Sequence, residues 1–309
     1  SFTVSDDASS IAGVLAQGGE LNNAEDVDVF GGTIDVLQAA AVQNITAYDD
    51  IDSGYVIEDS AGSVLGAQAT ILDSGVAHVD VNSIASANVG VALGSLEDSL
   101  EAGYSSDISF TVSDDASSIA GVLAQGDELD NADDVNVVGS TIDVAAADAV
   151  QDITAYDAVD SDYDIQDNAA TLLSSTGQAA VVDSGVDQVF VTDSSVDADT
   201  GVQLSSLEES LLNVTVNGET ANVNFTVTDS SSAVLSNGDE LLGADKINVT
   251  DEVSASDGAT LNILENSMDT VTTSQSADID FTVTDTAGAV ASELSSMTGD
   301  ELDNATDVN

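Results

Sequence analysis

A long internal repeat constrains this chain more than any other feature of its sequence. Residues 1–29 return as residues 109–137 with few substitutions, an offset of 108 residues. The same offset carries the run ITAYD at 45–49 onto 153–157. A chain of this kind builds its core from similar units that pack against their neighbours, so the repeat decides which folds are open to it.

The repeat predicts four segments. We expect a first repeat at 1–108, a second at 109–223, a shorter diverged third at 224–279, and the start of a further, truncated repeat at 280–309. The first and last residues are themselves repeat residues. We therefore expect a processed product or excised segment whose two ends lack capping structure.

Each repeat contains a finer unit, a short strand-like run followed by a stretch with helical spacing. Alternating apolar and polar residues with many β-branched side chains predict strands, roughly fifteen of them. Between the strands, Ala8, Ile11, Ala12 and Leu15 follow the spacing of one helix face, and so do Val89, Leu93, Leu96 and Leu100. Gly18, Gly126 and Gly238 stand where such helices would end. The pattern predicts a β-rich repeat solenoid of parallel strands with intervening short helices or turns, forming an elongated rod.

An aspartate closes most of the strand runs. A carboxylate there can accept hydrogen bonds from the first N–H groups of a helix, or it can join its neighbours in binding Ca²⁺ through oxygen ligands. Both interpretations remain open from sequence, and calcium is the only cofactor that the sequence suggests. The candidate residues are Asp6, Asp49, Asp59, Asp114, Asp157, Asp167, Asp193, Asp229, Asp251 and Asp285.

Charge excludes several classes of partner. The chain has 58 acidic residues and a single lysine or arginine, Lys246, for a formal net charge of −57. Such a chain repels nucleic acids and anionic membrane surfaces. It contains no apolar run long enough for membrane insertion. Self-repulsion of this size favours a saline medium, divalent cations, or both.

The sequence argues against an enzyme. The one histidine, His78, aligns with Gln188 of the second repeat, so we expect a solvent-facing strand residue there and not a catalytic base. Lys246 aligns with Asp26 and Asp134, and we expect a surface lysine among carboxylates. No catalytic residue is predicted, and no cysteine is present to act as a nucleophile.

Two runs of the second repeat carry a resemblance. The run YDIQDNAATLL at 163–173 followed by VDQVFVTD at 186–193 resembles tandem repeats of large secreted bacterial surface proteins, including adhesins and S-layer-associated proteins. The resemblance is one of repeat pattern and carries over no site residue. The GGxGxD calcium turn that such proteins often contain is missing from this sequence.

These observations predict an extracellular or cell-surface structural protein, bacterial or archaeal. We expect a non-catalytic part of a surface filament, sheath or adhesin stalk. Its partners would be copies of itself end to end, or further repeats of the same polypeptide. The alternative is a ligand-binding strand face on a secreted protein, with a glycan, mineral or ice surface as the ligand, because outward threonines recur in runs such as FTVTD.

Overall fold

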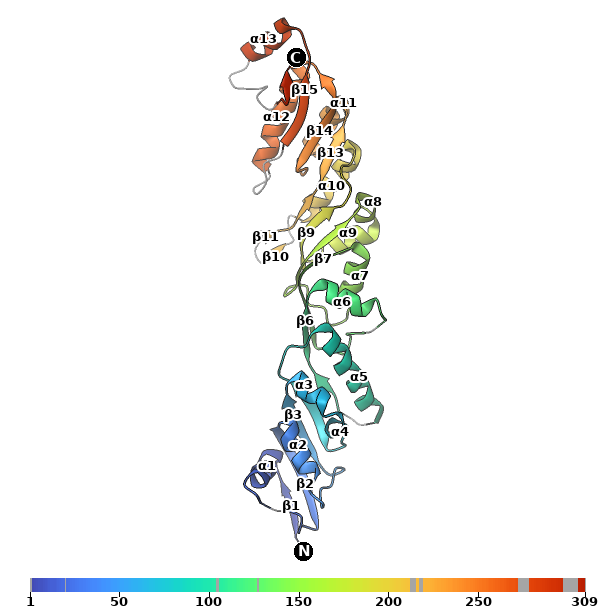
Figure 1. Cartoon of the computed structure of the whole chain (residues 1–309), viewed down its shortest axis with the longest axis vertical. Helices are drawn as coiled ribbons and strands as arrows, with labels where there is room; N and C mark the ends of the chain where they lie inside the picture. The colour runs from blue at the N-terminus through green and yellow to red at the C-terminus, as the bar shows by residue number, and fades with distance from the viewer. Residues whose placement is uncertain are drawn as a thin grey trace. The chain divides into compact units, whose positions relative to one another are not determined.

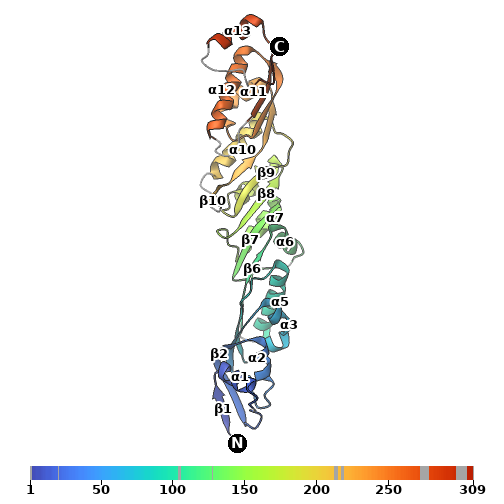
Figure 2. The same ribbon diagram turned by 60° about the vertical axis from the view of Figure 1, so that its left-hand side comes forward.

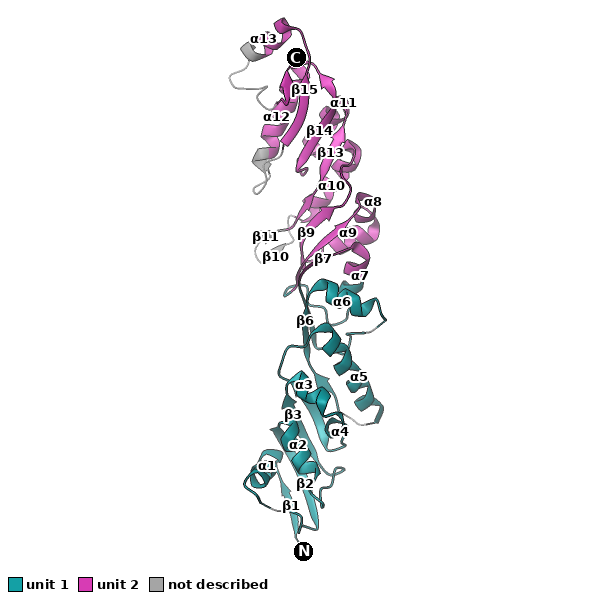
Figure 3. Cartoon of the chain, viewed as in Figure 1, with its two compact units in different colours: residues 1–138, 149–160 teal, residues 139–148, 161–309 magenta. Residues whose placement is uncertain are grey.

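Strands and helices alternate along most of the described chain (Figure 1). The structure is a computed structural model, and it divides into two compact units (Figure 3). Unit 1 comprises residues 1–138 and 149–160, and unit 2 comprises residues 139–148 and 161–309. The structure describes residues 2–19, 21–103, 106–126, 128–211, 215–216, 219–271, 278–296 and 305–308.

Unit 1 is built on a parallel sheet with strand order β1-β2-β3-β4-β5. A second sheet begins with β6, which pairs in parallel with the first half of β7. The elements are β1 (Thr3–Asp6), α1 (Ala8–Ala16), β2 (Asp26–Ile34), α2 (Val36–Gln43), β3 (Gly54–Asp59), α3 (Ala61–Gly66), α4 (Gln68–Ile71), β4 (Val76–Val81), α5 (Ala87–Gly103), β5 (Ile108–Ser109), β6 (Thr111–Asp114), α6 (Ala116–Leu123) and β7 (Asp134–Ile142).

The boundary between the two units falls within β7, whose residues from 139 onward belong to unit 2. Its strands continue the order β7-β8-β9-β12, and a further parallel sheet has the order β13-β14-β15-β16. Strands β10 and β11 form a small antiparallel pair. The elements are α7 (Val144–Gln151), β8 (Asp162–Asp167), α8 (Ala169–Leu172), α9 (Ser175–Val181), β9 (Val186–Val191), α10 (Ala198–Leu211), β10 (Thr215–Val216), β11 (Glu219–Thr220), β12 (Asn222–Asn224), β13 (Thr226–Asp229), α11 (Ser231–Asn237), the 3₁₀ helix η1 (Gly238–Glu240), β14 (Lys246–Val253), α12 (Ala255–Val271), β15 (Asp278–Val283), α13 (Ala287–Ser296) and β16 (Asp307–Val308).

Only one face of the sheets is buried. In β2, Val27 and Val29 are fully buried, whereas Asp26 and Asp28 on the other face remain partly exposed. Connections between parallel strands are right-handed, so strands paired in chain order place their connecting helices on the same face. Figure 2 gives a second view of these strand–helix crossovers. We call the uncovered, polar side of each sheet its open face.

The predicted β-rich solenoid rod is wrong. The strands do pair in parallel, but they form separate sheets of four or five strands in a mixed α/β fold. Helices, not short turns, make most of the connections, and α5 and α12 each reach 17 residues. The physical reason is that the Ala-, Leu- and Ser-rich stretches between strands carry both helical spacing and side-chain N-caps, which favour full helices.

Several local predictions can be checked residue by residue. The helix predicted from Ala8 to Leu15 is α1, and Gly18 and Gly126 adopt positive φ angles of 78° and 82° just after α1 and α6. Gly238 instead has helical φ and ψ angles. The run at 45–49 folds mostly as a turn, because the Ile45 and Tyr48 amides bond backward to Val42 and Ile45, and only Tyr48 bridges to a strand.

A glycine pair in β2 allows a close approach to α1. The register between β2 and β3 shifts between Phe30 and Thr33, and Gly31 and Gly32 there have φ angles of 60° and 79°. A Cβ on Gly32 would lie 3.2 Å from the Ala8 amide nitrogen. The bulge therefore brings the β2 backbone to the start of the neighbouring helix.

Among the described helices, none combines the length and the hydropathy needed to cross a lipid bilayer.

Candidate functional site

Most of the closing aspartates bind the first residue of a helix. That helix is not the one that follows the aspartate in the chain but one that precedes its strand. Asp59 follows β3, and its Oδ2 accepts a hydrogen bond from the backbone N–H of Val36, the first residue of α2 (3.3 Å). Its Oδ1 accepts from the Ser60 amide at 2.7 Å. One carboxylate therefore joins the end of one strand to the start of the helix that follows the preceding strand.

The same arrangement recurs through both units. In each case the aspartate lies in or just after the C-terminal part of a strand and accepts the first amide of a helix that precedes that strand in the chain. We call these seven residues the Asp ladder. Its bonds are Asp59–Val36 (3.3 Å), Asp114–Ala87 (3.0 Å), Asp167–Val144 (3.4 Å), Asp193–Ala169 (2.7 Å), Asp229–Ala198 (3.0 Å), Asp251–Ser231 (2.6 Å) and Asp285–Ala255 (3.1 Å).

Where a helix begins two residues after one of the predicted aspartates, its N-cap is the residue between them. Asp7, not Asp6, caps α1 through the Ser10 amide, and Asp115 caps α6 through the Ser118 amide. Hydrogen bonds from the side chain of Ser117 and from Ser118 lower the pKa of Asp115 to about 2. Two consecutive polar residues thus cap two different helices. The second caps the helix that follows it, and the first caps a helix that precedes its strand.

Three of the predicted residues stand outside the Asp ladder. The Asp6 carboxylate accepts the Asp7 amide, and no helix of the described chain lies before it. Asp49 and Asp157 close turns through the amides of Ile51 and Val159. These two lie in the runs that fold as turns, and so they do not meet a helix end.

Sequence reasoning missed one member of the same series. The Oγ of Ser83 accepts the amide of Ala61, the first residue of α3, at 2.9 Å. Ser83 occupies the position that Asp193 holds in the second repeat, where Asp193 accepts the first amide of α8. Alignment of the repeats around LDSGV and VDSGV contains this signal, but a search for closing aspartates passes over a serine.

Hydrogen bonding lowers the pKa of two carboxylates of the Asp ladder, Asp59 and Asp251. For Asp59, burial raises the pKa, but bonds from Ser60, Ser63 and Val36 outweigh it and leave the pKa below its usual value. For Asp251, the Ser231 amide and hydroxyl lower the pKa. An ionised carboxylate at a helix N-terminus is also favoured by the helix dipole.

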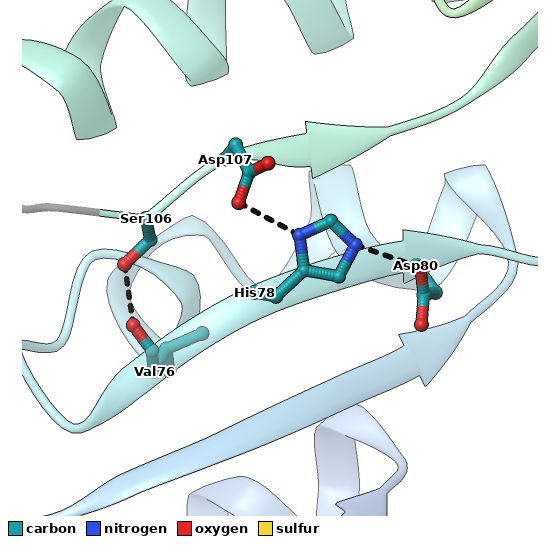
Figure 4. A network of polar contacts seen from close by, with 5 residues as sticks. All are labelled: Val76, His78, Asp80, Ser106 and Asp107. Atoms are coloured by element: carbon teal, nitrogen blue, oxygen red, sulfur yellow. Dashed lines mark hydrogen bonds and ion pairs between the residues drawn. The ribbon is translucent and has the colours of Figure 1, made fainter.

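His78 bridges two carboxylates on the open face of unit 1. Its Nδ1 lies 2.7 Å from Asp107 and its Nε2 lies 2.8 Å from Asp80 (Figure 4). Burial lowers the pKa of His78, but hydrogen bonds to Asp107 and Asp80 outweigh burial and raise it above its usual value. Ser106 closes the same loop by donating to the Val76 carbonyl. Both ring nitrogens are engaged, so His78 links Asp80 of its own strand β4 to Asp107, which directly precedes the neighbouring strand β5.

Lys246 does the same in unit 2. Its Nζ lies 3.2 Å from Asp278 and 2.5 Å from Asp280, both on the neighbouring strand β15. Hydrogen bonds to Asp280 and Asp278 raise the pKa of Lys246. The lysine and the histidine therefore each contact a pair of aspartates on an open face.

Half-buried glutamates on the long helices were not predicted. Burial and the charge of Asp245 raise the pKa of Glu208 in α10 to about 8, and burial raises the pKa of Asp245 to about 6. Glu97 in α5 has the same place in the repeat, and burial raises its pKa to about 7. The repeated runs SLEDSL and SLEESL contain these residues, and their helical spacing places the glutamate beside the buried leucines.

No group of three or more histidine, cysteine, aspartate or glutamate side chains is arranged to hold a metal ion within the described ranges. Calcium binding by the predicted aspartates stays a prediction. What the arrangement does provide is a set of carboxylate hydrogen bonds between successive strand–helix segments within each compact unit. No family model matches the chain, and no curated protein matches it either.

Proposed function

We propose that this chain is a non-catalytic structural protein of the cell surface, part of a filament, sheath or adhesin stalk. The observation that carries the proposal is the Asp ladder. Seven aspartates make one and the same contact, between the end of a strand and the first amide of the neighbouring helix. A catalytic site depends on one cluster of residues with distinct roles, whereas this contact joins successive strand–helix segments within each compact unit.

The candidate catalytic groups support the same function. His78 and Lys246 each lie between two aspartates on an open face, where they reduce repulsion between strands. Their repeat counterparts, Gln188 and Asp134, are a neutral and an acidic residue. Because such different side chains occupy the equivalent positions, we assign His78 and Lys246 a structural role.

Location outside the cell is supported by charge and by resemblance. A net charge of −57 suits a saline medium in which repulsion is screened over a few ångströms. The resemblance of residues 163–173 and 186–193 to repeats of secreted bacterial surface proteins agrees with a bacterial or archaeal surface.

Immunogold electron microscopy of the native source tests the proposal. Antibodies against the purified chain should label the cell surface, on filaments or a continuous layer. Mild protease treatment of intact cells should remove the label. Label confined to the cell interior, or a purified chain with turnover of a substrate, would overturn the proposal.

The open faces favour a second candidate, a ligand-binding surface. Thr3, Thr226 and Thr228 lie on strands of these faces, which leave their side chains partly accessible. A glycan, a mineral surface or ice is the ligand class. Binding of the purified chain to such a surface, reduced by Thr226→Asp combined with Thr228→Asp, would support this candidate, and unchanged binding would contradict it.

A further inference from the structure

The two units contain the same contact between a long helix and a turn. Glu97 of α5 and Glu208 of α10 are equivalent in the repeat, and so are Asp133 and Asp245, which lie in the turns before β7 and β14. In both turns the amide of the aspartate donates to the carbonyl of the residue just before β6 or β13, at 2.9 and 3.0 Å. In both contacts burial raises the pKa of the glutamate, and the charge of the aspartate adds to this. Each helix therefore brings a half-buried glutamate close to an aspartate of the turn.

In unit 1 an asparagine side chain lies in this contact. A Cβ on Gly94 of α5 would be 3.5 Å from the Cβ of Asn131. The Asn131 Nδ2 donates to the Gly94 carbonyl at 3.1 Å and to Asp98 at 3.0 Å. Glu97 also accepts a hydrogen bond from the Ile108 amide, which partly opposes the effect of burial on its pKa. N–H donors thus serve the acidic side of α5.

Unit 2 has different residues at the two positions that meet. Gly243 stands where unit 1 has Asn131, and Ser205 stands where unit 1 has Gly94. A Cβ on Gly243 would lie 3.1 Å from Ser205 Oγ and would collide with Glu208 Oε2. The hydroxyl and the carboxylate oxygen therefore border the same small space beside the Gly243 backbone.

Both oxygens are buried, and neither has a hydrogen-bond partner in the part of the chain that the structure describes. Ser205 is only 8% exposed, and the unpaired atoms are its Oγ and the Oε2 of Glu208. Burial and then the charge of Asp245 raise the pKa of Glu208. A carboxylate removed from water is stable when a positive charge or a donor is paired with it. The chemistry of the three side chains therefore suits a cation.

We propose that Glu208, Asp245 and Ser205 form a binding site for a Ca²⁺ ion beside the backbone of Gly243. The two acidic side chains and the hydroxyl offer only oxygen ligands, and Ca²⁺ accepts roughly six to eight oxygens in flexible geometry, including backbone carbonyls and water. Mg²⁺ suits the site less well, because it demands nearly ideal octahedral geometry. A bound ion would tie α10 to the turn before β14. The inference goes beyond the proposed function, since the site does not depend on where the chain is located.

Isothermal titration calorimetry of the full chain with CaCl₂ tests the site. The titration is run at pH 8 in 1 M NaCl, where screening over roughly 3 Å weakens diffuse binding to the 58 acidic residues. Wild type should bind one more Ca²⁺ per chain than Glu208→Gln. Glu209→Gln removes the same charge from an exposed position and should bind as the wild type does. Equal binding by wild type and Glu208→Gln would overturn the proposal.

A double variant tests the site without changing the net charge. Ser205→Gly combined with Gly243→Asn gives unit 2 the residues that unit 1 has at Gly94 and Asn131, and it keeps both carboxylates. Because this chain already contains that pairing, we expect the variant to fold, and its melting curve in chelator checks this. It should bind Ca²⁺ at the site at least tenfold more weakly. Undiminished binding by the folded variant would contradict a site built around Ser205 and Gly243.

Hydrogen exchange locates the ion. The Ala244 amide donates to the Leu241 carbonyl at 3.1 Å, and the equivalent Ala132 amide donates to the Leu129 carbonyl at 3.0 Å. Ca²⁺ should slow exchange at Ala244 severalfold and leave exchange at Ala132 nearly unchanged. Equal slowing at the two amides would indicate general stabilisation by salt and would refute a site specific to unit 2.

Discussion

Asp6 and Asp114 have the same local sequence but different bonding partners. Asp114 accepts the Ala87 and Asp115 amides, whereas Asp6 accepts the Asp7 amide. At the scale of one residue, comparing Asp114 with Asp6 therefore isolates the effect of the bond from the aspartate to a preceding helix. Each such bond pairs a carboxyl oxygen with a helix N–H that has no partner inside its own helix.

We predict that Asp114→Ala destabilises unit 1 by about 0.5–2 kcal/mol, the usual cost of losing a helix cap. Asp6→Ala is the matched control and should cost clearly less, because it breaks no bond to a helix of the described chain. Thermal unfolding followed by circular dichroism measures the difference, and faster hydrogen exchange at the Ala87 amide locates it. Equal melting temperatures for the two variants would show that the ladder bond adds nothing.

Glu208 gives a pH prediction. Its folded pKa of about 8 lies above the unfolded value near 4.5, chiefly through burial. Its contribution to stability is therefore present below about pH 4.5 and is lost as pH rises through about 8. Glu208→Gln should melt roughly 2–6 °C above the wild type at pH 8, a shift that corresponds to about 1–2 kcal/mol in a unit of this size.

The exposed neighbour Glu209 supplies the control for that experiment. Glu209→Gln removes the same charge one residue further along α10. It should leave the slope of melting temperature against pH between 5 and 8 close to that of the wild type. If both variants flatten the slope equally, net charge and not burial of Glu208 is the cause.

At the scale of the helix, glycine has two opposite effects in this chain. Gly90 in α5 lies against Val112, whereas a Cβ on Gly121 in α6 would have nothing within 4 Å. Gly90→Ala should therefore cost about 1–3 kcal/mol by overpacking. Gly121→Ala should gain about 0.5–1 kcal/mol through helix propensity. Chemical denaturation measures the change in the free energy of unfolding of each variant. Stabilisation by Gly90→Ala would contradict the close packing of Gly90 against Val112.

The elements were more predictable than their partners. The spacing of Ala8, Ile11 and Leu15 is a local property, and it located α1. The partner of Asp59 lies 23 residues earlier in the chain, at Val36, and the sequence contains no direct mark of that distance. Periodicity locates an element, but the offset between a carboxylate and a neighbouring helix depends on the length of the whole strand–helix unit.

The fold class was missed for a related reason. Strand runs such as FTVSD are compact and easy to see, so they dominated the interpretation. The helices between them are rich in Ala, Ser and Gly, and their apolar stripes are weak. Their share of the core is nevertheless large: Leu93 and Leu100 of α5 are fully buried, and Gly90 packs against Val112.

At the scale of the whole molecule, repulsion among carboxylates opposes folding. On the open face of unit 1, burial together with the charges of Asp26, Asp52 and Asp49 raises the pKa of Asp28. His78 and Lys246 relieve such repulsion at two places, but 58 acidic residues remain. Folding concentrates these charges, so ions in solution should stabilise the folded chain.

We predict that the melting temperature rises by several degrees between 0.05 and 1 M NaCl, as the Debye length falls from more than 10 Å to about 3 Å. Calcium should add to this at matched ionic strength, because one divalent ion can interact with two carboxylates of the Asp26–Asp28 neighbourhood and binds only weakly to the unfolded chain. Asp28→Asn should reduce the calcium increment and leave the NaCl increment nearly unchanged. Identical melting curves in millimolar calcium and in chelator, at equal ionic strength, would rule out the calcium prediction and leave screening alone as the stabilising effect of salt.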